Sequence, residues 1–206
     1  MLLKPNMLAG ALPQRAVTTH PAVFEAVIRV LREEGIGRLS YGDSPGFPNV
    51  DTEKCADTCG LAEVAARLEV PAADFGHGSM VHFPEGIRAG SFVLCEGVQQ
   101  ADCIVNLCKM KTHGLERLTG AVKNMYGCVL GLNKGTGHVS YPNAQVFAEM
   151  LIDLNRCVKP RLHIMDGIVA MEGNGPASGT PVPMKVLLFS ADPVALDTVF
   201  AMLVHV

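Results

Sequence analysis

The 206-residue sequence contains no Trp, and aromatic residues make up only 5% of it. Because 49% of the residues are hydrophobic, burial of aliphatic side chains has to drive folding. No apolar stretch approaches the roughly 20 residues that a membrane-spanning helix needs, and the first residues do not have the pattern of a signal peptide. We therefore expect a cytoplasmic protein with no membrane partner.

An excess of basic residues is also absent. The formal net charge is −3 and the pI is about 6.1. A nucleic-acid-binding surface needs positive charge over a whole face of the protein. We therefore expect no nucleic-acid partner, and any attraction for anions has to be local.

Closely spaced cysteines are missing as well. The seven Cys are odd in number, scattered through apolar segments, and form no C-x₂-C-x₂-C motif. This pattern argues against a secreted disulfide framework and favours reduced, buried thiols. Cys108 and Cys128 flank a lysine-rich segment and are the two thiols closest to a candidate site.

Short apolar runs alternate with helical patterns along the chain. The expected strands cover residues 1–3, 38–41, 91–94, 103–107, 162–165 and 186–189, and the expected helices cover residues 20–35, 58–68, 143–157 and 192–206. Such alternation predicts one α/β domain over residues 1–206, with a mostly parallel sheet, helices on both faces, and a three-layer Rossmann-like arrangement. The first strand begins at Met1 and the last helix has no C-cap, so we expect both ends of the domain to be truncated.

Polar and glycine-rich segments follow several of the expected strands. They cover residues 4–6, 42–46, 109–114 and 166–176. In an open parallel sheet, the loops after the strands converge on one crevice. We therefore expect these segments to form one shared site.

Four lysines lie between residues 103 and 138 with few acidic neighbours. Ammonium groups beside amides and hydroxyls suit a phosphate or a carboxylate, although a solvated loop is the alternative explanation. The sequence thus predicts a small anionic ligand. The expected binding residues are Lys4, Asn6, Asp43, Ser44, Lys109, Lys111, Thr112, Lys123, Asn124, Gly173 and Gly175.

Two residues are candidates for proton transfer. His113 lies in the expected lysine loop, and Asp166 follows an expected strand. His113 has an equally plausible role as a residue that only hydrogen-bonds the loop backbone. His20 precedes a proline at a helix start, where capping explains it, and His138 follows a glycine-rich turn.

Three carboxylates on separate segments are candidates for Mg²⁺ ligands. Asp43, Asp166 and Glu172 supply the oxygen ligands that this cation prefers, and turn formation or helix capping is the alternative. Neither a strand-adjacent G-x-G-x-x-G nor a G-x-x-x-x-G-K-[ST] motif occurs. The common nucleotide-binding fingerprints are therefore absent.

Ordered sequence blocks extend over nearly the whole chain. They cover residues 3–6, 18–21, 42–46, 109–114, 119–124, 166–167, 171–176 and 192–197. With these blocks the chain resembles the family called domain of unknown function 362. The resemblance implies an association with iron–sulfur proteins, because many members carry fused 4Fe-4S ferredoxin modules, but it assigns no role to any residue. The 4Fe-4S ligand motif of those modules is absent here.

Three hypotheses for function follow. The first is a domain that binds a small anionic metabolite, with or without a reaction. The second, suggested by the resemblance, is a redox-associated module with an iron–sulfur electron-transfer partner. The third is a structural interaction domain whose polar loops simply face solvent.

Overall fold

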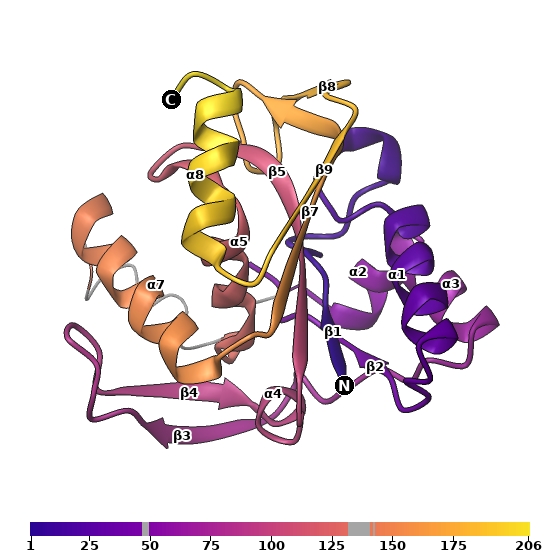
Figure 1. Cartoon of the computed structure of the whole chain (residues 1–206), viewed down its shortest axis with the longest axis horizontal. Coiled ribbons are helices and arrows are strands. Elements are labelled where there is room, and N and C mark those ends of the chain that lie inside the picture. The colour runs from indigo at the N-terminus through magenta and orange to yellow at the C-terminus, as the bar shows by residue number, and fades with distance from the viewer. Residues whose placement is uncertain (47–49, 132–140, 142) are drawn as a thin grey trace.

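The computed structural model describes residues 1–46, 50–131, 141 and 143–206. Its central sheet has the order β2-β1-β5-β7, and these four strands are parallel (Figure 1). They span Ser40–Tyr41, Leu2–Lys4, Ile104–His113 and Leu162–Glu172, respectively. Three shorter strands pair antiparallel with this core, namely β6 (Arg117–Thr119) with β5, and β8 (Thr180–Val182) and β9 (Val186–Ser190) with β7. The predicted α/β fold with a mostly parallel sheet is confirmed.

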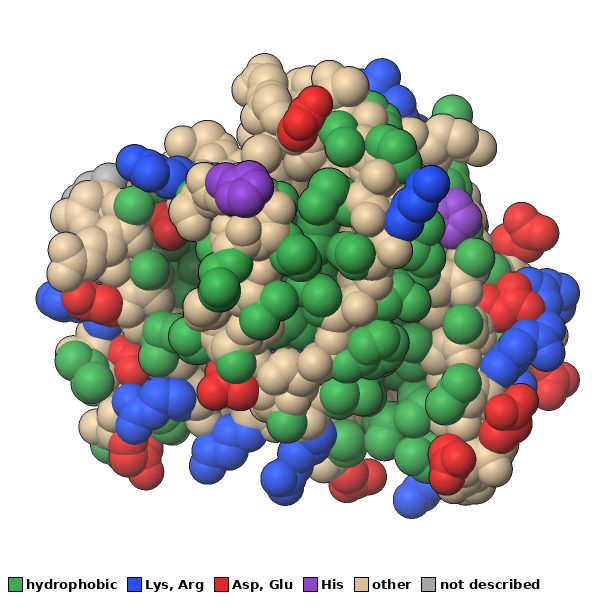
Figure 2. Space-filling model, turned by 45° about the horizontal axis from the view of Figure 1, so that its top comes forward, with side chains coloured by type: hydrophobic (Ala, Val, Ile, Leu, Met, Phe, Trp, Pro, Cys, Tyr) green, Lys and Arg blue, Asp and Glu red, His purple; other side chains and the backbone are tan. Residues whose placement is uncertain are grey.

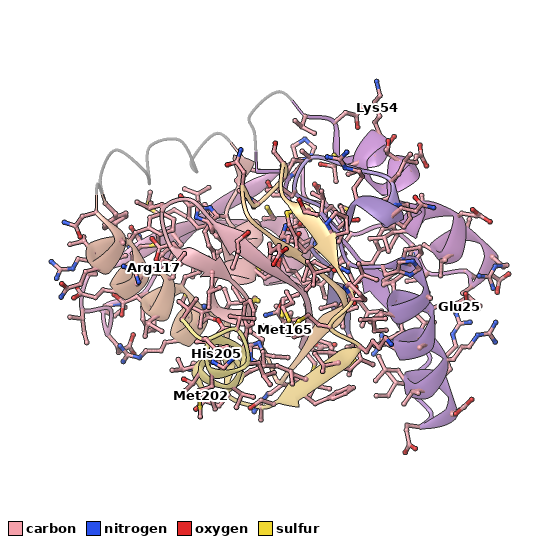
Figure 3. The ribbon with its side chains drawn as sticks, turned by 90° about the horizontal axis from the view of Figure 1, so that it is seen from above. Glu25, Lys54, Arg117, Met165, Met202 and His205 are labelled. Atoms are coloured by element: carbon pink, nitrogen blue, oxygen red, sulfur yellow. The ribbon has the colours of Figure 1, made fainter. Side chains whose placement is uncertain are left out.

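Helices cover both faces of this sheet, which makes three layers. On one face lie α1 (Pro21–Glu33), α2 (Thr52–Thr58) and α3 (Leu61–Arg67); on the other lie α5 (Ala121–Asn124), α7 (Ala144–Val158) and α8 (Pro193–Leu203). Short helical segments lie at η1 (Pro13–Arg15), α4 (Glu96–Gln99) and η2 (Met125–Cys128). Figure 3 shows Met165 of β7 between Glu25 on α1 and Met202 on α8. Among the described residues, none of the helices has the length and apolarity to cross a membrane.

Three expected elements differ from the prediction. The run at residues 91–94 is β4 (Ser91–Cys95), which pairs antiparallel with β3 (Gly78–His82) in a separate two-stranded sheet. The helix expected over residues 58–68 is two helices, because Gly60 adopts φ +76° between them. The last helix ends at Leu203, where the Val204 amide donates to Phe200, and His205 then turns the chain with φ +57°.

The parallel strand β5 is longer than expected. The sequence predicted its end at residue 107, yet it continues through Lys109 and Lys111 to His113. Both lysine side chains are buried. A buried strand accepts lysines only if their ammonium groups are paired or hydrogen-bonded, so these residues belong to the sheet and not to a solvent loop.

Helix α1 begins where it meets the end of β7. His20 is its N-cap, with Nδ1 accepting the Ala22 amide at 3.2 Å, and Pro21 occupies the first turn. The backbone N–H of His20 donates to Asp166 at 2.9 Å. The predicted capping role of His20 is confirmed, and the same residue ties α1 to the sheet.

The surface over α8 and β9 is unusually apolar (Figure 2). Met202 is 71% exposed and Phe189 is 60% exposed. Ile168, Leu187, Val194 and Val199 are also exposed. None of these side chains lines the polar cavity described below.

Candidate functional site

A cavity of about 300 Å³, which we call the lysine cavity, lies beyond the carboxyl ends of β1, β2 and β5. Its lining includes eight of the predicted site residues, which are Lys4, Asn6, Asp43, Ser44, Lys111, His113, Lys123 and Asn124. Tyr126, Gly127 and Pro176 also line it. The topology therefore gathers residues from distant parts of the sequence, with three lysines facing one acidic residue.

Lys4 and Asp43 form a buried ion pair at one wall of the cavity, with 2.7 Å between Nζ and Oδ1. Lys4 also donates to the Pro5 carbonyl at 3.1 Å, and the Met7 amide donates to Asp43 at 2.8 Å. A Cβ atom at Gly127 would stand 1.9 Å from Asp43 Oδ1. The pair thus requires glycine at position 127.

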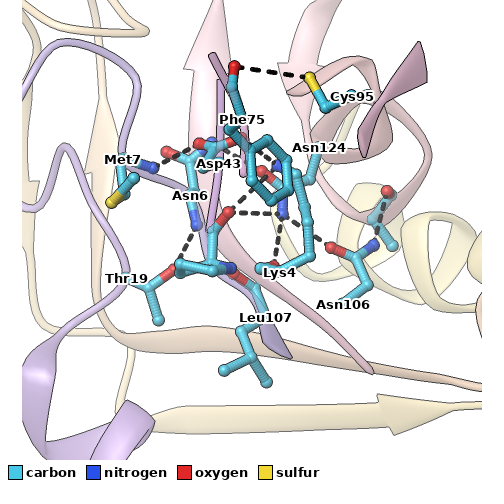
Figure 4. A network of polar contacts seen from close by, with 12 residues as sticks. Lys4, Asn6, Met7, Thr19, Asp43, Phe75, Cys95, Asn106, Leu107 and Asn124 are labelled. Atoms are coloured by element: carbon cyan, nitrogen blue, oxygen red, sulfur yellow. Dashed lines mark hydrogen bonds and ion pairs between the residues drawn. The ribbon is translucent and has the colours of Figure 1, made fainter. Parts of the chain in front are cut away.

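A directional chain of hydrogen bonds runs from the cavity into the protein interior, and Figure 4 shows its middle members, Asn6, Asn124 and Asn106. Lys111 donates to Asn6 Oδ1 at 2.9 Å, and Asn6 Nδ2 donates to Asn124 Oδ1 at 2.8 Å. Asn124 then donates to Asn106 Oδ1 at 2.7 Å, and Asn106 Nδ2 contacts His163 Nδ1 at 2.9 Å. In each of the three Asn side chains, the oxygen accepts from the neighbour on the Lys111 side and the nitrogen donates to the neighbour on the His163 side. The orientation of each amide group is therefore determined.

This chain fixes the protonation state of His163. Asn106 presents a donor to Nδ1, so Nδ1 has to accept and Nε2 carries the proton of the neutral ring. Burial lowers the pKa of His163 to about 4, while the charge of Asp192 acts in the opposite direction. His163 is therefore neutral at physiological pH.

The lysines of the cavity retain donors for a ligand. An ammonium group has three N–H donors. Lys111 uses two of them, on Asn6 and on the Val17 carbonyl at 2.7 Å. Lys123 makes no hydrogen bond or ion pair with another residue in the described part of the chain, and its Nζ lies 5.5 Å from the centre of the Phe147 ring. Lys123 is thus the ammonium most available to an anion.

Burial makes two of these ammonium groups easier to deprotonate. It lowers the pKa of Lys111 to about 7, and the nearby charge of Lys123 lowers it further. It also lowers the pKa of Lys123 to about 8, against the opposing effect of Glu116. An anion in the cavity would favour the charged forms of both residues.

Lys109 and Asp166 lie outside the cavity lining. They form a second buried ion pair at 2.7 Å, and Asp166 also accepts the amides of His20 and Ile168. Both side chains are about 1% exposed. Asp166 therefore holds β5, β7 and α1 together, and this position offers no contact with a ligand in the cavity for the predicted proton transfer.

Four other predicted site residues, Thr112, Glu172, Gly173 and Gly175, lie outside the lining of the lysine cavity. Thr112 and Glu172 line a separate cavity of about 260 Å³ beside Met110. Gly175 packs against Thr112, where a Cβ would stand 2.2 Å from the Thr112 carbonyl oxygen. Gly173 has φ +75° in the same turn. Gly173 and Gly175 lie in the loop after β7, and none of these four residues lines the lysine cavity.

His113 caps a turn beside the cavity. Its Nδ1 accepts the amides of Leu115 and Glu116, each at 3.1 Å. The imidazole thus has the backbone-binding role that was the alternative to catalysis, although the residue also lines the cavity. Lys134 and His138 lie outside the described residues.

The three candidate Mg²⁺ ligands are not gathered into one group. Asp43 and Asp166 are each paired with a lysine, and Glu172 is exposed. Within the part of the chain that the structure describes, no three His, Cys, Asp or Glu residues are arranged to hold a metal ion. None of the seven cysteines forms a disulfide, and Cys108 and Cys128 lie in separate apolar clusters.

Sequence reasoning missed three residues that build the site. Asn106 and His163 complete the hydrogen-bond chain, and an amide inside the apolar run Ile104–Cys108 was the available signal. Asp197 of α8 accepts the amides of Ala121 at 2.6 Å and Val122 at 2.9 Å, which anchors the segment that carries Lys123. Burial raises the pKa of Asp197 to about 6.

Comparisons with known proteins agree with this architecture. The chain is 36% identical over 200 residues to a thylakoid-associated protein of Synechocystis sp., and the match covers 97% of the chain and 61% of that relative. The chain thus spans about three-fifths of the relative's length. The lactate racemase apoprotein from Thermoanaerobacterium thermosaccharolyticum has a similar fold, with a TM-score of 0.59, 10% identity, and coverage of 95% of this chain and 47% of that one.

The family assignment rests on the sequence profile. The profile of the family described as "Domain of unknown function (DUF362)" matches residues 1–202. This match includes every strand of the central sheet and all the cavity residues. The chain belongs to the DUF362 family.

Proposed function

We propose that the cavity beyond β1, β2 and β5 binds a small anion bearing a phosphate or a carboxylate group. The observation that carries the proposal is the presence of Lys4, Lys111 and Lys123 around one cavity whose described lining residues include a single carboxylate, on Asp43. Because Asp43 is already paired with Lys4, the charges of Lys111 and Lys123 are left without a counter-ion in the cavity.

The geometry also supports selective recognition. Lys111 and Asn6 are oriented by the buried hydrogen-bond chain, so the lysine can direct its third N–H toward a ligand without losing its other contacts. A preorganised donor loses little conformational entropy on binding. The likeness to lactate racemase concerns the fold at 10% identity, and the proposal rests on the cavity itself.

If a reaction follows binding, Lys111 and His113 are our candidates for proton transfer. Lys111 has a pKa lowered to about 7 by burial, so it exchanges its proton near neutral pH. His113 lines the same cavity. We assign no such role to Asp166, which is paired with Lys109 and does not line this cavity.

Replacing Lys123 with Met should weaken anion binding about 10- to 100-fold, because a charge-assisted hydrogen bond contributes about 1.5–3 kcal/mol. The test is calorimetric titration with inorganic phosphate, glycerol phosphate, malate and lactate, after a thermal-shift screen of the same compounds. Lys54→Met is the matched control, since Lys54 projects outward from α2 (Figure 3). No stabilising compound, or equal affinity in Lys123→Met and the wild type, would refute the proposal.

Binding of malate or lactate, whose charge is constant over this range, should weaken as the pH rises from about 6 to about 9, because burial lowers the pKa of Lys111 to about 7 and that of Lys123 to about 8. The stability of the ligand-free protein should show the opposite trend from these two groups. Their pKa values are lower in the folded state, so above about pH 7 the unfolded chain binds more protons, and their contribution to the free energy of unfolding increases with pH. Titrations at constant ionic strength check the first trend, and urea unfolding checks the second; affinity that is constant or increases with pH would contradict this account.

A further inference from the structure

A second cavity, of about 210 Å³, lies between the end of α7 and the start of α8. Its polar and charged lining consists of Asn155, Arg156, Lys159, His163 and Asp192. None of these residues lines the lysine cavity, although His163 is the last member of the hydrogen-bond chain that starts there. The two cavities are therefore separate in space and connected by one polar network.

Two buried polar atoms of this lining lack a partner within the described structure, namely His163 Nε2 and Asn155 Oδ1. The exposed fractions of these residues are 0% and 8%. Buried polar groups in native proteins are nearly always hydrogen-bonded to the protein or to a bound molecule. Two unpartnered atoms on residues of one cavity therefore indicate a bound molecule.

The chemical role of each atom is determined. His163 Nε2 carries a proton because Nδ1 accepts from Asn106. Asn155 Nδ2 donates to the carbonyls of Leu151 at 2.8 Å and Val122 at 3.0 Å, so the remaining atom is the oxygen. The residues that line the cavity thus carry one donor and one acceptor without a protein partner.

The charges around the cavity favour an anion that still carries a proton. Arg156 and Lys159 are cationic, and the N-terminus of α8 adds positive potential. Asp192 already caps α8 through Oδ1, and its negative charge opposes a fully deprotonated anion. The acceptor Asn155 Oδ1 likewise requires an occupant with a hydrogen to donate.

We propose that this second cavity binds a small oxyanion that keeps a protonated oxygen at neutral pH, of which inorganic phosphate is the simplest. One phosphate oxygen accepts from His163 Nε2, and the phosphate hydroxyl donates to Asn155 Oδ1. Lys159 supplies the balancing charge, since Arg156 at the rim is already paired with Asp153 at 3.3 Å. The inference does not depend on ligand binding in the lysine cavity.

The test is a titration of the ¹⁵N-labelled protein with inorganic phosphate, and with sulfate at matched ionic strength. Phosphate should shift the Asn155 side-chain amide and the backbone amides near Lys159 and Val194 in a saturable manner. Sulfate has no proton to donate at neutral pH and should bind at least about tenfold more weakly, since the acceptor Asn155 Oδ1 would stay unpaired.

Lys159→Asn tests the site without disturbing the fold. Lys159 is exposed and has φ +53°, a conformation that Asn tolerates. Phosphate affinity at this cavity should fall about three- to fivefold, as expected for one partly exposed cation. Lys185→Asn is the control, because Lys185 is exposed, has φ +58° and lies outside the cavity.

The outcomes separate the two proposals. Lys123→Met should leave the phosphate-induced shift changes around Asn155, and the phosphate affinity that they report, unchanged, even if it abolishes binding in the lysine cavity. No saturable shift around Asn155, equal affinity for sulfate and phosphate, or equal phosphate affinity in Lys159→Asn and Lys185→Asn would overturn the second site and would leave the first proposal intact. If only water fills the cavity, phosphate should cause no saturable shift around Asn155.

Discussion

Replacing Asp166 with Ala should lower the free energy of unfolding by about 3–5 kcal/mol, because it leaves the buried Lys109 ammonium without its counter-ion. Burial lowers the pKa of Lys109, and Asp166 opposes this effect, so in the variant the lysine should lose its charge more readily. The variant also loses the carboxylate that accepts the His20 amide at the start of α1. Urea unfolding followed by far-UV circular dichroism measures the loss.

Two variants serve as controls for this prediction. The double variant Asp166→Leu/Lys109→Met removes both charges and should be more stable than Asp166→Ala. Glu25→Ala breaks an ion pair with Arg29 and Arg67 on the outer face of α1 and should change stability far less (Figure 3). If Asp166→Ala were as stable as Glu25→Ala, the pair would not have the structural role assigned to it.

Replacing Asn106 with Leu should also be strongly destabilising, by about 3 kcal/mol or more. The substitution leaves His163 Nδ1 and the Ala121 carbonyl without their donor, and Asn124 Nδ2 loses its shortest contact. Each buried unpaired group costs about 1–3 kcal/mol. Unfolding with urea is the measurement, and a loss below about 1 kcal/mol would show that the chain of hydrogen bonds is not maintained in solution.

Asn106→Asp gives a more specific readout of the same network. Aspartate still accepts from Asn124 but cannot donate to His163, so the imidazole should shift its proton to Nδ1. In the wild type, ¹⁵N NMR should show the Nε2–H form, with no protonation until the pH approaches about 4. Because the folded-state pKa lies below the ordinary value of 6.5, His163 should cost stability as the pH falls from about 6.5 to about 4.

The fold was predictable because its signals are local. The His20-Pro21 start of α1 and the apolar runs around Leu3, Val105 and Ile164 marked the elements and their parallel order. The pairing of Ser91–Cys95 with Gly78–His82 was not predictable, because an apolar run of five residues does not reveal its partner strand. The apolar run Val186–Ser190 likewise does not reveal that it pairs antiparallel with β7.

The candidate site was predictable in part for a similar reason. Lys4, Asp43 and Lys123 follow or flank recognisable elements, and the convergence of parallel strands places them together. The sequence alone predicts a loop at Lys109 and Lys111, because lysines are rarely fully buried. Their partners, Asp166 for Lys109 and Asn6 for Lys111, are 57 and 105 residues away in the sequence, and no local pattern reveals such pairing.

Lys111 and Lys123 line one cavity, and we propose that this cavity accepts an anion. The most direct test is a crystal structure with selenate, whose anomalous signal locates the ion without ambiguity. We expect a peak within hydrogen-bonding distance of Lys123 Nζ and Lys111 Nζ, which disappears in Lys123→Met crystals grown under the same conditions. A well-ordered structure with an empty lysine cavity, or with selenate bound only on the outer surface, would contradict it.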